Sequence, residues 1–559
     1  MINVGAADDF VNDAEERLAA ANVEQQRATW VAENFITHDT QIIAAQAHQK
    51  QIALGVDLAK KAAHFDDAGG LSYDTRRKLD LIKLLLTTPG PSDPWKTARL
   101  ATIAAEMDAM YGAAKFGDLD VEAITKIMQR ERDPQRLLEV WRGWHSTARP
   151  MKSLFAEFVE LTNEGARELG YRDAGAMWRS KYDMPPDAFS IEADRLWHQV
   201  KPLYDCLHSY VRRKLRLPDG RPIPAHLLGN IWAQEWGNIF DLVAPADFAR
   251  GFDLTGILEA RKEIDAAGMV RIAERFFTSL GFAPLPGTFW ERSLFTRPRD
   301  REVVCHASAW DIDDEDDLRV KMCISKTADY FQTVHHELGH NFYQRAYNHL
   351  PFLYKDSAND AFHEAIGDTI ALSITPGYLV KIGLLDEEPP ESSDIPLLLR
   401  EALDKVAFLP FGILIDKWRW RVFSGDITPA NYNRAWWDLR LQYQGIAPPV
   451  ERSEDGFDPG AKYHIAANVP YMRYFLARIL QFQLHRALCR AAGSSGPLHR
   501  CSIYDNKAAG ERLMKMLAMG RSRPWPEALE ALTGERQMDA GAMLEYFAPL
   551  QAWLDRQDR

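Results

Sequence analysis

The sequence predicts a mainly helical fold, and three observations support this expectation. Apolar residues recur at helical spacing along most of the 559 residues. The connections between these segments are short and rich in Pro, Gly and Asp. Strand-favouring residues are concentrated most clearly in two neighbouring runs. Because no low-complexity linker separates independent domains, we expect one large helical unit with two lobes around a deep central cleft.

The first helices are expected near the N-terminus, where long segments combine helical spacing of apolar residues with few breakers. The predicted helices there cover residues 8–35, 71–86 and 94–116. Helical patterns continue almost to the C-terminus. They are interrupted by predicted loops such as YDMPPDAF (182–189) and LLDEEPPESSDIP (384–396).

The clearest departure from helical spacing is EVVCHASAWDI (302–312) followed by LRVKMCISK (318–326). Both runs are rich in residues that favour strands, and the acidic segment DDEDD (313–317) lies between them. We therefore expect a short β-hairpin here, directly before the next helical segment.

The balance of charge excludes some classes of partner. The chain has 67 basic and 79 acidic residues, a net charge of −12, which argues against a general binder of nucleic acid or anionic membranes. No apolar run approaches the length of a membrane span. The first residues also lack the pattern of a secretory signal. We expect no nucleic-acid partner, no membrane span and a monomer, either cytosolic or exported with its signal removed.

The five cysteines leave the compartment open. Cys305 and Cys323 are close in the sequence, as are Cys489 and Cys501, whereas Cys206 is left over. None of them forms a CxxC motif. Five buried free thiols and two local disulfides both fit this spacing, and the second arrangement would mean an oxidising compartment.

A metal-binding pattern follows the predicted hairpin. TVHHELGHNF (333–342) places His336 and His340 four residues apart, with Glu337 between them. Histidines at this spacing share one face of a helix, where they can hold one metal ion while the glutamate reaches its water. Two exposed histidines on a helix are the alternative, and a third ligand would weaken it.

The segment NDAFHEAIGDTIALSI (359–374) supplies that third ligand. It begins with a capping Asn-Asp pair and places Glu364 and Asp368 four residues apart on one face. Two histidines and one glutamate are an established ligand set for catalytic zinc. Glu364 would be the ligand, and Asp368 would orient a ligand histidine through its other ring N–H. A solvated acidic face is the alternative, but the rest of this helix is apolar.

These residues predict hydrolysis of a peptide or amide bond without a covalent intermediate. Zinc would lower the pKa of a bound water molecule to about 7 and polarise a carbonyl oxygen. Glu337 would take the proton from the water molecule and deliver it to the leaving amine.

Beyond HHELGH (335–340) and FHEAIGD (362–368), the chain resembles one family of zinc metallopeptidases along most of its length. This is the angiotensin-converting enzyme family, the peptidyl-dipeptidase A type. Its segments occur here in the same order: IWAQEWGNIFDLV (231–243), EVVCHASAWD (302–311), FLPFGILIDKWRWRVFSGDIT (408–428), FDPGAKYHIAANVPYMRYF (457–475) and GPLHRCSIYDNKAAGERL (496–513). The resemblance implies a helical zincin fold. It also implies a single catalytic domain over residues 1–559, with a helical lid at about 1–110 and a zinc-binding core at about 230–480.

The resemblance also implies roles for individual residues. The zinc ligands would be His336, His340 and Glu364, with Glu337 as general base and Asp368 behind the ligands. The residues that match the family's substrate-binding positions are Gln234, Lys462 and Tyr471 for the C-terminal carboxylate, His306 and His464 for the penultimate carbonyl, Tyr474 for the oxyanion, and the main chain of Ala307 and Ala309 for the extended peptide.

The implied activity is removal of dipeptides from the free C-termini of oligopeptides. Gln234 favours this activity, because the branch of the family that releases single residues carries an arginine at that position. The alternatives are such a carboxypeptidase, a non-catalytic binding protein on the same fold, and a cytosolic oligopeptidase with reduced cysteines. This chain keeps both the His-Glu-x-x-His motif and the third ligand, which argues against the non-catalytic alternative.

The resemblance further pairs Cys305 with Cys323 and Cys489 with Cys501 as disulfides, and leaves Cys206 free. These pairs favour an exported protein, periplasmic or secreted, whose signal has been removed. The absence of an N-x-Ser/Thr sequon argues against a glycosylated animal ectodomain and fits a bacterial enzyme. No anchor is expected after Leu554.

Chloride is the expected activator, since the family is chloride-activated. Tyr182 and Arg473 match its second chloride site. Trp436, Trp437 and Arg440 match its first site, but His145 stands where that site has another arginine. Arg478 also replaces an aromatic residue near the primed-side pocket, so we expect a different side-chain preference.

Overall fold

The computed structural model describes residues 4–245 and 252–557. These residues form two compact units, and each unit combines three stretches that are distant in the sequence. The first unit comprises Met1–Leu86, Phe252–Pro389 and Ala477–Tyr546. The second unit comprises Thr87–Gly251, Pro390–Leu476 and Phe547–Arg559. The single catalytic domain expected from the sequence, with its lid and core, stays a prediction.

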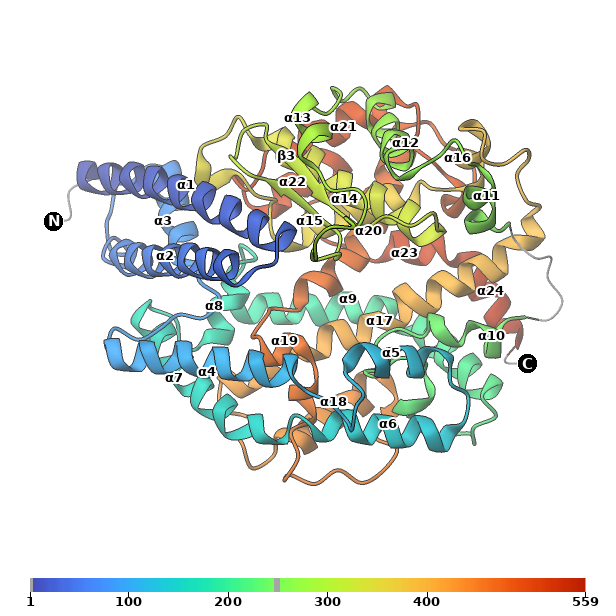
Figure 1. Cartoon of the computed structure of the whole chain (residues 1–559), viewed down its shortest axis with the longest axis horizontal. Helices are drawn as coiled ribbons and strands as arrows, with labels where there is room; N and C mark the ends of the chain where they lie inside the picture. The colour runs from blue at the N-terminus through green and yellow to red at the C-terminus, as the bar shows by residue number, and fades with distance from the viewer. Residues whose placement is uncertain (1–3, 246–251, 558–559) are drawn as a thin grey trace. The chain divides into compact units, whose positions relative to one another are not determined.

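The first unit contains the predicted metal ligands. Its α-helices and its two strands (Figure 1) are α1 (Val4–Asn34), α2 (His38–Ala63), α3 (Tyr73–Lys83), α11 (Leu254–Ala260), α12 (Ala266–Ser279), α13 (Gly287–Arg292), β2 (Ser308–Asp311), β3 (Leu318–Lys321), α14 (Ala328–Tyr347), α15 (Asp360–Leu372), α16 (Pro376–Lys381), the part of α20 (Met472–Ala491) from Ala477 on, α21 (Lys507–Leu517), α22 (Trp525–Thr533) and α23 (Gly541–Tyr546).

The second unit contains the predicted carboxylate-binding residues. Its α-helices and its two short strands are α4 (Pro94–Gly112), α5 (Val121–Arg130), α6 (Pro134–Ser146), α7 (Lys152–Glu168), α8 (Ala174–Ser180), α9 (Pro186–Lys214), β1 (Ile223–Pro224), α10 (Phe240–Val243), α17 (Asp394–Phe423), α18 (Tyr432–Gln444), β4 (Ile446–Ala447), α19 (Tyr463–Ala466) and α24 (Ala548–Gln557). Short 3₁₀ turns connect several elements of both units.

The expected mainly helical fold and the expected hairpin are confirmed. Strands β2 and β3 are antiparallel, with Ser308 opposite Lys321 and Asp311 opposite Leu318. The acidic segment 313–317 forms their turn, in which Asp313 Oδ1 accepts hydrogen bonds from three successive backbone N–H groups. This side-chain cap satisfies donors that the turn would otherwise leave unpaired.

Two predicted loops are shorter than the sequence indicated. Helix α9 begins at Pro186, inside the predicted loop 182–189, because a proline in the first helical turn has no N–H to lose and a preset φ. Helix α17 begins at Asp394, inside the predicted loop 384–396, where an acidic residue favours the helix N-terminus. In both cases the residue type that suggested a loop marks the start of a helix.

Packing fixes the N-terminal helices within the first unit. Helices α1, α2 and α3 share a buried cluster that includes Val11, Leu18, Leu58 and Ile82, and α1 and α2 run side by side (Figure 1). A second small cluster joins Trp30 of α1 to the strand β2 and its turn. Among the described helices, none is both long and apolar enough to cross a membrane.

Candidate functional site

The predicted metal-binding residues lie where α14 and α15 approach each other very closely. Thr327 caps α14 and Asn359 caps α15, as the sequence pattern predicted for the second helix. A Cβ atom on Gly339 would lie 2.9 Å from Gly367 Cα, and one on Gly367 would lie 2.6 Å from His336 Nδ1. These two glycines therefore permit the contact that brings ligands of both helices together.

The three predicted ligands converge in this contact. The Nε2 atoms of His336 and His340 are 3.1 Å apart. His336 Nε2 also lies 3.8 Å from Glu364 Oε2, and one donor atom from each of the three residues falls within 4.8 Å of the others. This separation suits three ligands of one tetrahedral ion with about 2.0–2.2 Å bonds.

The hydrogen bonds made by Nδ1 of each ligand histidine determine which ring nitrogen carries the proton and leave Nε2 facing the other predicted ligands. His336 Nδ1 lies 3.1 Å from Asp368 Oδ1 and must donate to it. His340 Nδ1 lies 3.0 Å from His363 Nδ1, whose Nε2 is 3.0 Å from the Tyr347 hydroxyl. If His363 donates to Tyr347, its Nδ1 accepts from His340.

Both Nε2 atoms then present lone pairs to each other beside a carboxylate. Such an arrangement is repulsive unless a proton or a cation lies among the three groups, and two imidazole nitrogens with one carboxylate oxygen are a donor set that fits zinc. Charge in the surroundings points the same way. Burial would lower the pKa of His336, but the hydrogen bond and charge of Asp368 outweigh it and raise that pKa to about 9. The surroundings of His336 therefore stabilise positive charge, whereas burial and the charge of His336 lower the pKa of His340.

Asp368 is itself held by two further side chains of the same unit. Its Oδ2 atom accepts a hydrogen bond from Gln481 Nε2 at 3.1 Å and lies 3.6 Å from Arg478 Nη1. Arg478 thus lies beside the carboxylate that orients His336. The side-chain preference that the sequence analysis attached to this residue stays a prediction.

Glu337 is buried between the metal ligands and strand β2. It is 8% exposed, and burial raises the pKa of its carboxyl group. The charges of His336 and Lys321 oppose this rise, as does the nearby backbone of Ala309. Ala309 therefore lies next to the predicted general base, as a strand that positions a peptide beside it would require.

The segment before β2 is fixed at several points. Lys321 Nζ donates to the carbonyl oxygens of Val304 and His306 at 2.7 and 2.8 Å, and lies 3.1 Å from a carboxylate oxygen of Glu33 at the end of α1. The Val304 N–H donates to the Glu33 carbonyl oxygen at 2.9 Å. The disulfide between Cys305 and Cys323, which is confirmed, closes the same segment. His306 is exposed beside this anchored backbone.

In the second unit, Lys462 forms a cationic centre in an aromatic cage. Its Nζ donates to Gln234 Oε1 at 2.6 Å and lies 4.1 Å from the ring centroid of Trp232 and 5.5 Å from that of Tyr471. Burial lowers the pKa of Lys462 to about 7, against the charge of Glu235. A buried ammonium with mainly neutral neighbours would gain strongly from a carboxylate.

Asp416 and Arg419 of α17 brace the chain that carries the remaining candidates. Asp416 Oδ2 accepts from the backbone N–H groups of Tyr471 and Met472 at 2.8 and 2.7 Å. Arg419 pairs with Asp416 and donates to the His464 carbonyl oxygen at 2.8 Å. The two residues therefore fix the backbone on either side of the loop between His464 and Tyr471.

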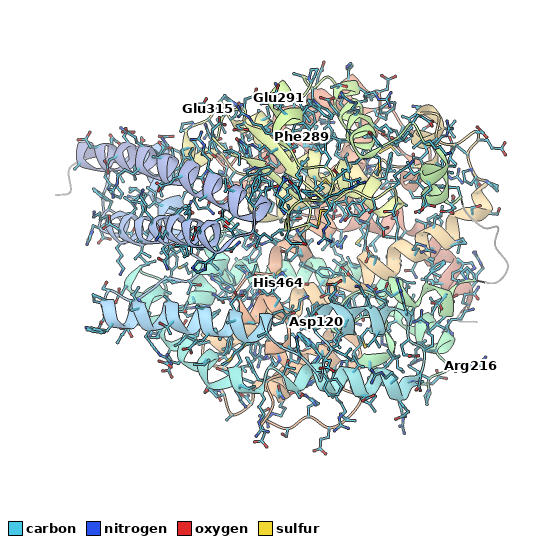
Figure 2. All side chains as sticks on the ribbon, in the orientation of Figure 1. Asp120, Arg216, Phe289, Glu291, Glu315 and His464 are labelled. Atoms are coloured by element: carbon cyan, nitrogen blue, oxygen red, sulfur yellow. A yellow bond between two sulfur atoms is a disulfide. The ribbon has the colours of Figure 1, made fainter. Side chains whose placement is uncertain are left out.

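The rings of His464, Tyr471 and Tyr474 form one contact group, and Figure 2 marks His464. The centroid of His464 lies 4.7 Å from that of Tyr471 and 5.6 Å from that of Tyr474. Burial, together with the cations Lys462, Arg419 and Arg473, lowers the pKa of His464 to about 2. His464 is therefore neutral at physiological pH and can donate only one ring N–H.

The predicted first chloride position is a buried aromatic cluster around Arg440. The guanidinium lies 5.1 Å from the ring centroid of Trp437 and 5.8 Å from that of Trp436, and donates to the Trp232 carbonyl oxygen at 2.7 Å. Within the described part of the chain, Arg440 Nε has no hydrogen-bond partner. His145 is buried and stacks on Trp141, and burial lowers its pKa to about 4.

The predicted second chloride residues are less distinctive. Tyr182 is 4% exposed and stacks on Phe189 with ring centroids 4.1 Å apart. Arg473 is half-buried near His464.

Several supporting residues were missed by sequence reasoning. His363, Tyr347, Gln481, Asp416, Arg419 and Trp232 were not singled out. His363 offered a signal, because it directly precedes the ligand Glu364 and belongs to the quoted FHEAIGD segment. Trp232, Asp416 and Arg419 also lie in segments that carry the resemblance. Like Tyr347 and Gln481, they contact their partners only through the tertiary fold, so spacing alone gave them no role.

A helix with His-Glu-x-x-His, completed by a glutamate from the next helix, is the ligand arrangement of a class of zinc metallopeptidases. The comparisons with known proteins agree with this class. A profile described as angiotensin-converting enzyme, of the M2 peptidases, matches residues 2–559. The chain belongs to the angiotensin-converting enzyme family.

Individual relatives differ in how much of them the chain covers. It is 43% identical to angiotensin-converting enzyme of Sus scrofa in an alignment that covers 99% of this chain and 44% of that protein. It is 40% identical to the angiotensin-converting enzyme-like protein Ace3 of Mus musculus, covering 98% of this chain and 77% of the relative. With angiotensin-converting enzyme of Theromyzon tessulatum it shares 44% identity over 78% of this chain and 71% of the relative. The chain thus spans less than half the length of the Sus scrofa protein.

Proposed function

We propose that this chain is a zinc-dependent peptidyl-dipeptidase that removes dipeptides from the free C-termini of oligopeptides. The observation that carries the proposal is the convergence of His336 Nε2, His340 Nε2 and Glu364 Oε2 in a chain of this family. Glu337, buried beside these ligands, supplies the remaining group that hydrolysis needs.

The chemistry divides between the metal and the chain. When bound, zinc would lower the pKa of a water molecule and polarise the scissile carbonyl. Glu337 accepts the proton of the attacking water and delivers it to the leaving amine. The Tyr474 hydroxyl donates a hydrogen bond to the oxyanion as charge develops there and keeps its proton. Asp368 and His363 hold the two ligand histidines with their Nε2 atoms free.

Substrate binding is assigned to groups that suit a peptide end. Lys462, Gln234 and Tyr471 bind the C-terminal carboxylate, which one cation and neutral donors can satisfy. The side chains of His306 and His464 donate to the penultimate carbonyl. The main chain of Ala307 and Ala309 pairs with the extended peptide, as at an exposed strand edge.

Chloride is proposed as an activator that binds beside Arg440, with Trp436 and Trp437, and beside Arg473, with Tyr182. Support for the first position comes from Arg440 Nε, a buried donor with no hydrogen-bond partner among the described residues. Burial lowers the pKa of Arg440 to about 9, and a nearby anion would oppose this shift.

We further propose that the protein is exported and monomeric. The two confirmed disulfides support an oxidising compartment, such as a periplasm or the extracellular space. Cys206 is not in a disulfide.

The test is mass spectrometry of the products from a decapeptide with a blocked N-terminus and a free C-terminus. Wild-type protein should release residues in pairs, and both a chelator and Glu337→Gln should abolish release. Glu315, an exposed residue of the hairpin turn (Figure 2), provides the matched control, since Glu315→Gln should cleave like wild type.

The remaining outcomes separate the alternatives. Release of single residues would mean that Gln234 does not mark a dipeptide-releasing enzyme, and the chain would be a carboxypeptidase. Zinc bound without any cleavage would contradict the proposed activity and favour a peptide-binding protein.

A further inference from the structure

A pocket in the second unit contains more basic than acidic side chains. Helices α8, α9, α17 and α18 contribute to its walls. Its lining residues are Arg172, Arg179, Asp187, Ser190, Lys417, Trp420, Arg421, Ser424, Asp426, Leu439, Gln442 and Tyr443. None of the metal ligands or the proposed substrate-binding residues is among them.

Arg179 has very few partners for a buried cation. It is 6% exposed, and its guanidinium lies 4.9 Å from the ring centroid of Trp420. Among the described residues, its closest anionic contact is Asp187 Oδ1, 3.8 Å from Nη2, and its Nε atom has no hydrogen-bond partner. A guanidinium that leaves water without gaining hydrogen bonds is costly, so a partner is expected.

Further donors face the same region. Trp420 is 4% exposed, and its Nε1 has no hydrogen-bond partner within the described ranges. Lys417 Nζ donates to Asp194 Oδ2 at 2.7 Å and lies 3.3 Å from Ser190 Oγ. Burial lowers the pKa of both Arg179 and Lys417, which is the change that a nearby anion would reverse.

The acidic groups at the pocket already have partners. Asp187 accepts two hydrogen bonds from Arg172, and Asp426 accepts one from Ser424 Oγ at 2.8 Å. Asp194 accepts hydrogen bonds from Lys417 and from the Tyr443 hydroxyl, the latter at 3.0 Å. Arg421 is exposed to solvent, so Arg179 is the buried lining cation whose donors are least satisfied among the described residues.

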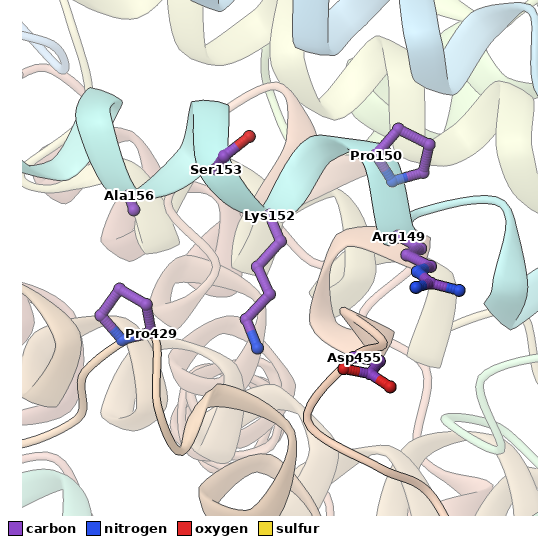
Figure 3. A pocket seen from close by; sticks show the side chains of 7 residues that line it. All are labelled: Arg149, Pro150, Lys152, Ser153, Ala156, Pro429 and Asp455. Carbon is purple, nitrogen blue, oxygen red and sulfur yellow. The ribbon is translucent and has the colours of Figure 1, made fainter.

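A second depression of this unit shows the contrast (Figure 3). Its lining includes Arg149, Lys152 and Asp455. The Lys152 ammonium donates to the Glu454 carbonyl oxygen and lies 3.4 Å from a carboxylate oxygen of the same residue. Lys152 therefore has hydrogen-bond partners within the protein, and nothing at this second depression calls for a bound anion.

We propose that the pocket at Arg179 binds a small oxyanion, a carboxylate or phosphate group, with the Arg179 guanidinium as its main donor. A planar guanidinium presents parallel N–H groups that match two oxygens of one anion, and Lys417 and Ser190 offer further donors at the pocket. This site is independent of the proposed peptidase activity.

The experiment is isothermal titration calorimetry of the zinc-loaded protein with inorganic phosphate and, separately, with acetate, in chloride-free buffer. Wild type should bind at least one of the two anions, and which one binds separates phosphate from carboxylate. Arg179→Gln should weaken this binding about 10- to 100-fold, as expected when a charged hydrogen-bond donor is lost. Arg434→Gln, on an exposed part of α18, should bind like wild type.

Two further variants locate the binding. Lys462→Met removes the other candidate carboxylate site and should leave the Arg179-dependent binding in place. Arg179→Lys keeps the positive charge but loses the two parallel N–H groups of the guanidinium, so it should bind the anion more weakly than wild type. This variant tests the proposal even if Arg179→Gln does not fold. Equal binding by wild type and Arg179→Lys would overturn the proposal. So would binding of neither anion by wild type, or a crystal soaked in whichever anion binds that holds only ordered water at Arg179.

Discussion

The metal cluster and the Lys462 cluster are built in opposite ways. The metal ligands come from two consecutive helices, α14 and α15, held in contact by Gly339 and Gly367. The Lys462 cluster is built mainly from loops, and its central hydrogen bond joins Gln234 to a residue 228 positions later. Helices fix the first cluster, whereas the second depends on the Asp416–Arg419 brace.

This difference suggests that the metal cluster is the more rigid of the two and that the Lys462 cluster can adapt to a ligand. A metal ion needs ligands held within a few tenths of an ångström, which packed helices provide. A peptide carboxylate needs a cation that pairs strongly with it, and the buried Lys462 is proposed to supply that cation. We therefore expect changes in the first cluster to act on kcat and changes in the second to act on KM.

The largest effect is expected from Glu337→Gln. Removing the proton-transfer group should lower kcat by about 10²- to 10⁴-fold, while zinc content stays at one equivalent. Steady-state kinetics on a short peptide and metal analysis of the same sample check this. A raised KM with unchanged kcat would contradict the expectation that changes in the metal cluster act on kcat.

The second largest effect is expected from Lys462→Met. It keeps the volume of a buried side chain and removes the cation, so KM should rise by about 30-fold or more, as for a charge pair that loses one partner. A peptide with a C-terminal amide provides the control. Wild type should lose a similar factor on this amide, and the variant should lose little more. A variant that still discriminates strongly between acid and amide would exclude Lys462 as the carboxylate's main partner.

His363→Ala tests the support behind the metal. Without the Nδ1 acceptor, the His340 ring loses its orientation, and zinc affinity should fall by about 10- to 100-fold. Competition with a chromophoric chelator measures the affinity, and His499→Ala, a change in the same unit far along the sequence from the ligands, serves as a comparison. Unchanged affinity would show that packing alone orients His340.

The smallest effect is that of pH on KM. Burial lowers the pKa of Lys462 to about 7 in the free protein, so its ammonium is charged below that pH and neutral above it. Binding of a carboxylate favours the charged form. KM should therefore be nearly constant below about pH 7 and rise above it, by at most about tenfold per pH unit. Lys462→Met should lack this rise, and a wild-type KM that falls with pH would contradict the assignment.

The sequence predicted the elements whose information is local. The His336–His340 spacing, the Asn359 cap and the runs that became β2 and β3 each depend on neighbouring residues. The disulfides, and the candidates Gln234, Lys462 and Tyr471, came from resemblance and not from spacing. Gln481 and Arg419 were out of reach for a physical reason, since each contacts a partner, Asp368 or the His464 carbonyl group, that only the tertiary fold brings close. The predicted ends of the loops before α9 and α17 were wrong, because proline and aspartate, found here at Pro186 and Asp394, favour both turns and helix starts.

The end of α1 is joined to the strand segment beside Glu337 by several independent contacts. Besides the bonds of Glu33, Arg301 Nε donates to the Asn34 carbonyl oxygen at 2.8 Å, and the rings of Trp30 and Trp310 meet edge to face with centroids 5.5 Å apart. We therefore expect the end of α1 and strand β2 to move together. A bend or truncation of α1 would tilt Ala309 and His306 with it, although α1 itself supplies no catalytic group.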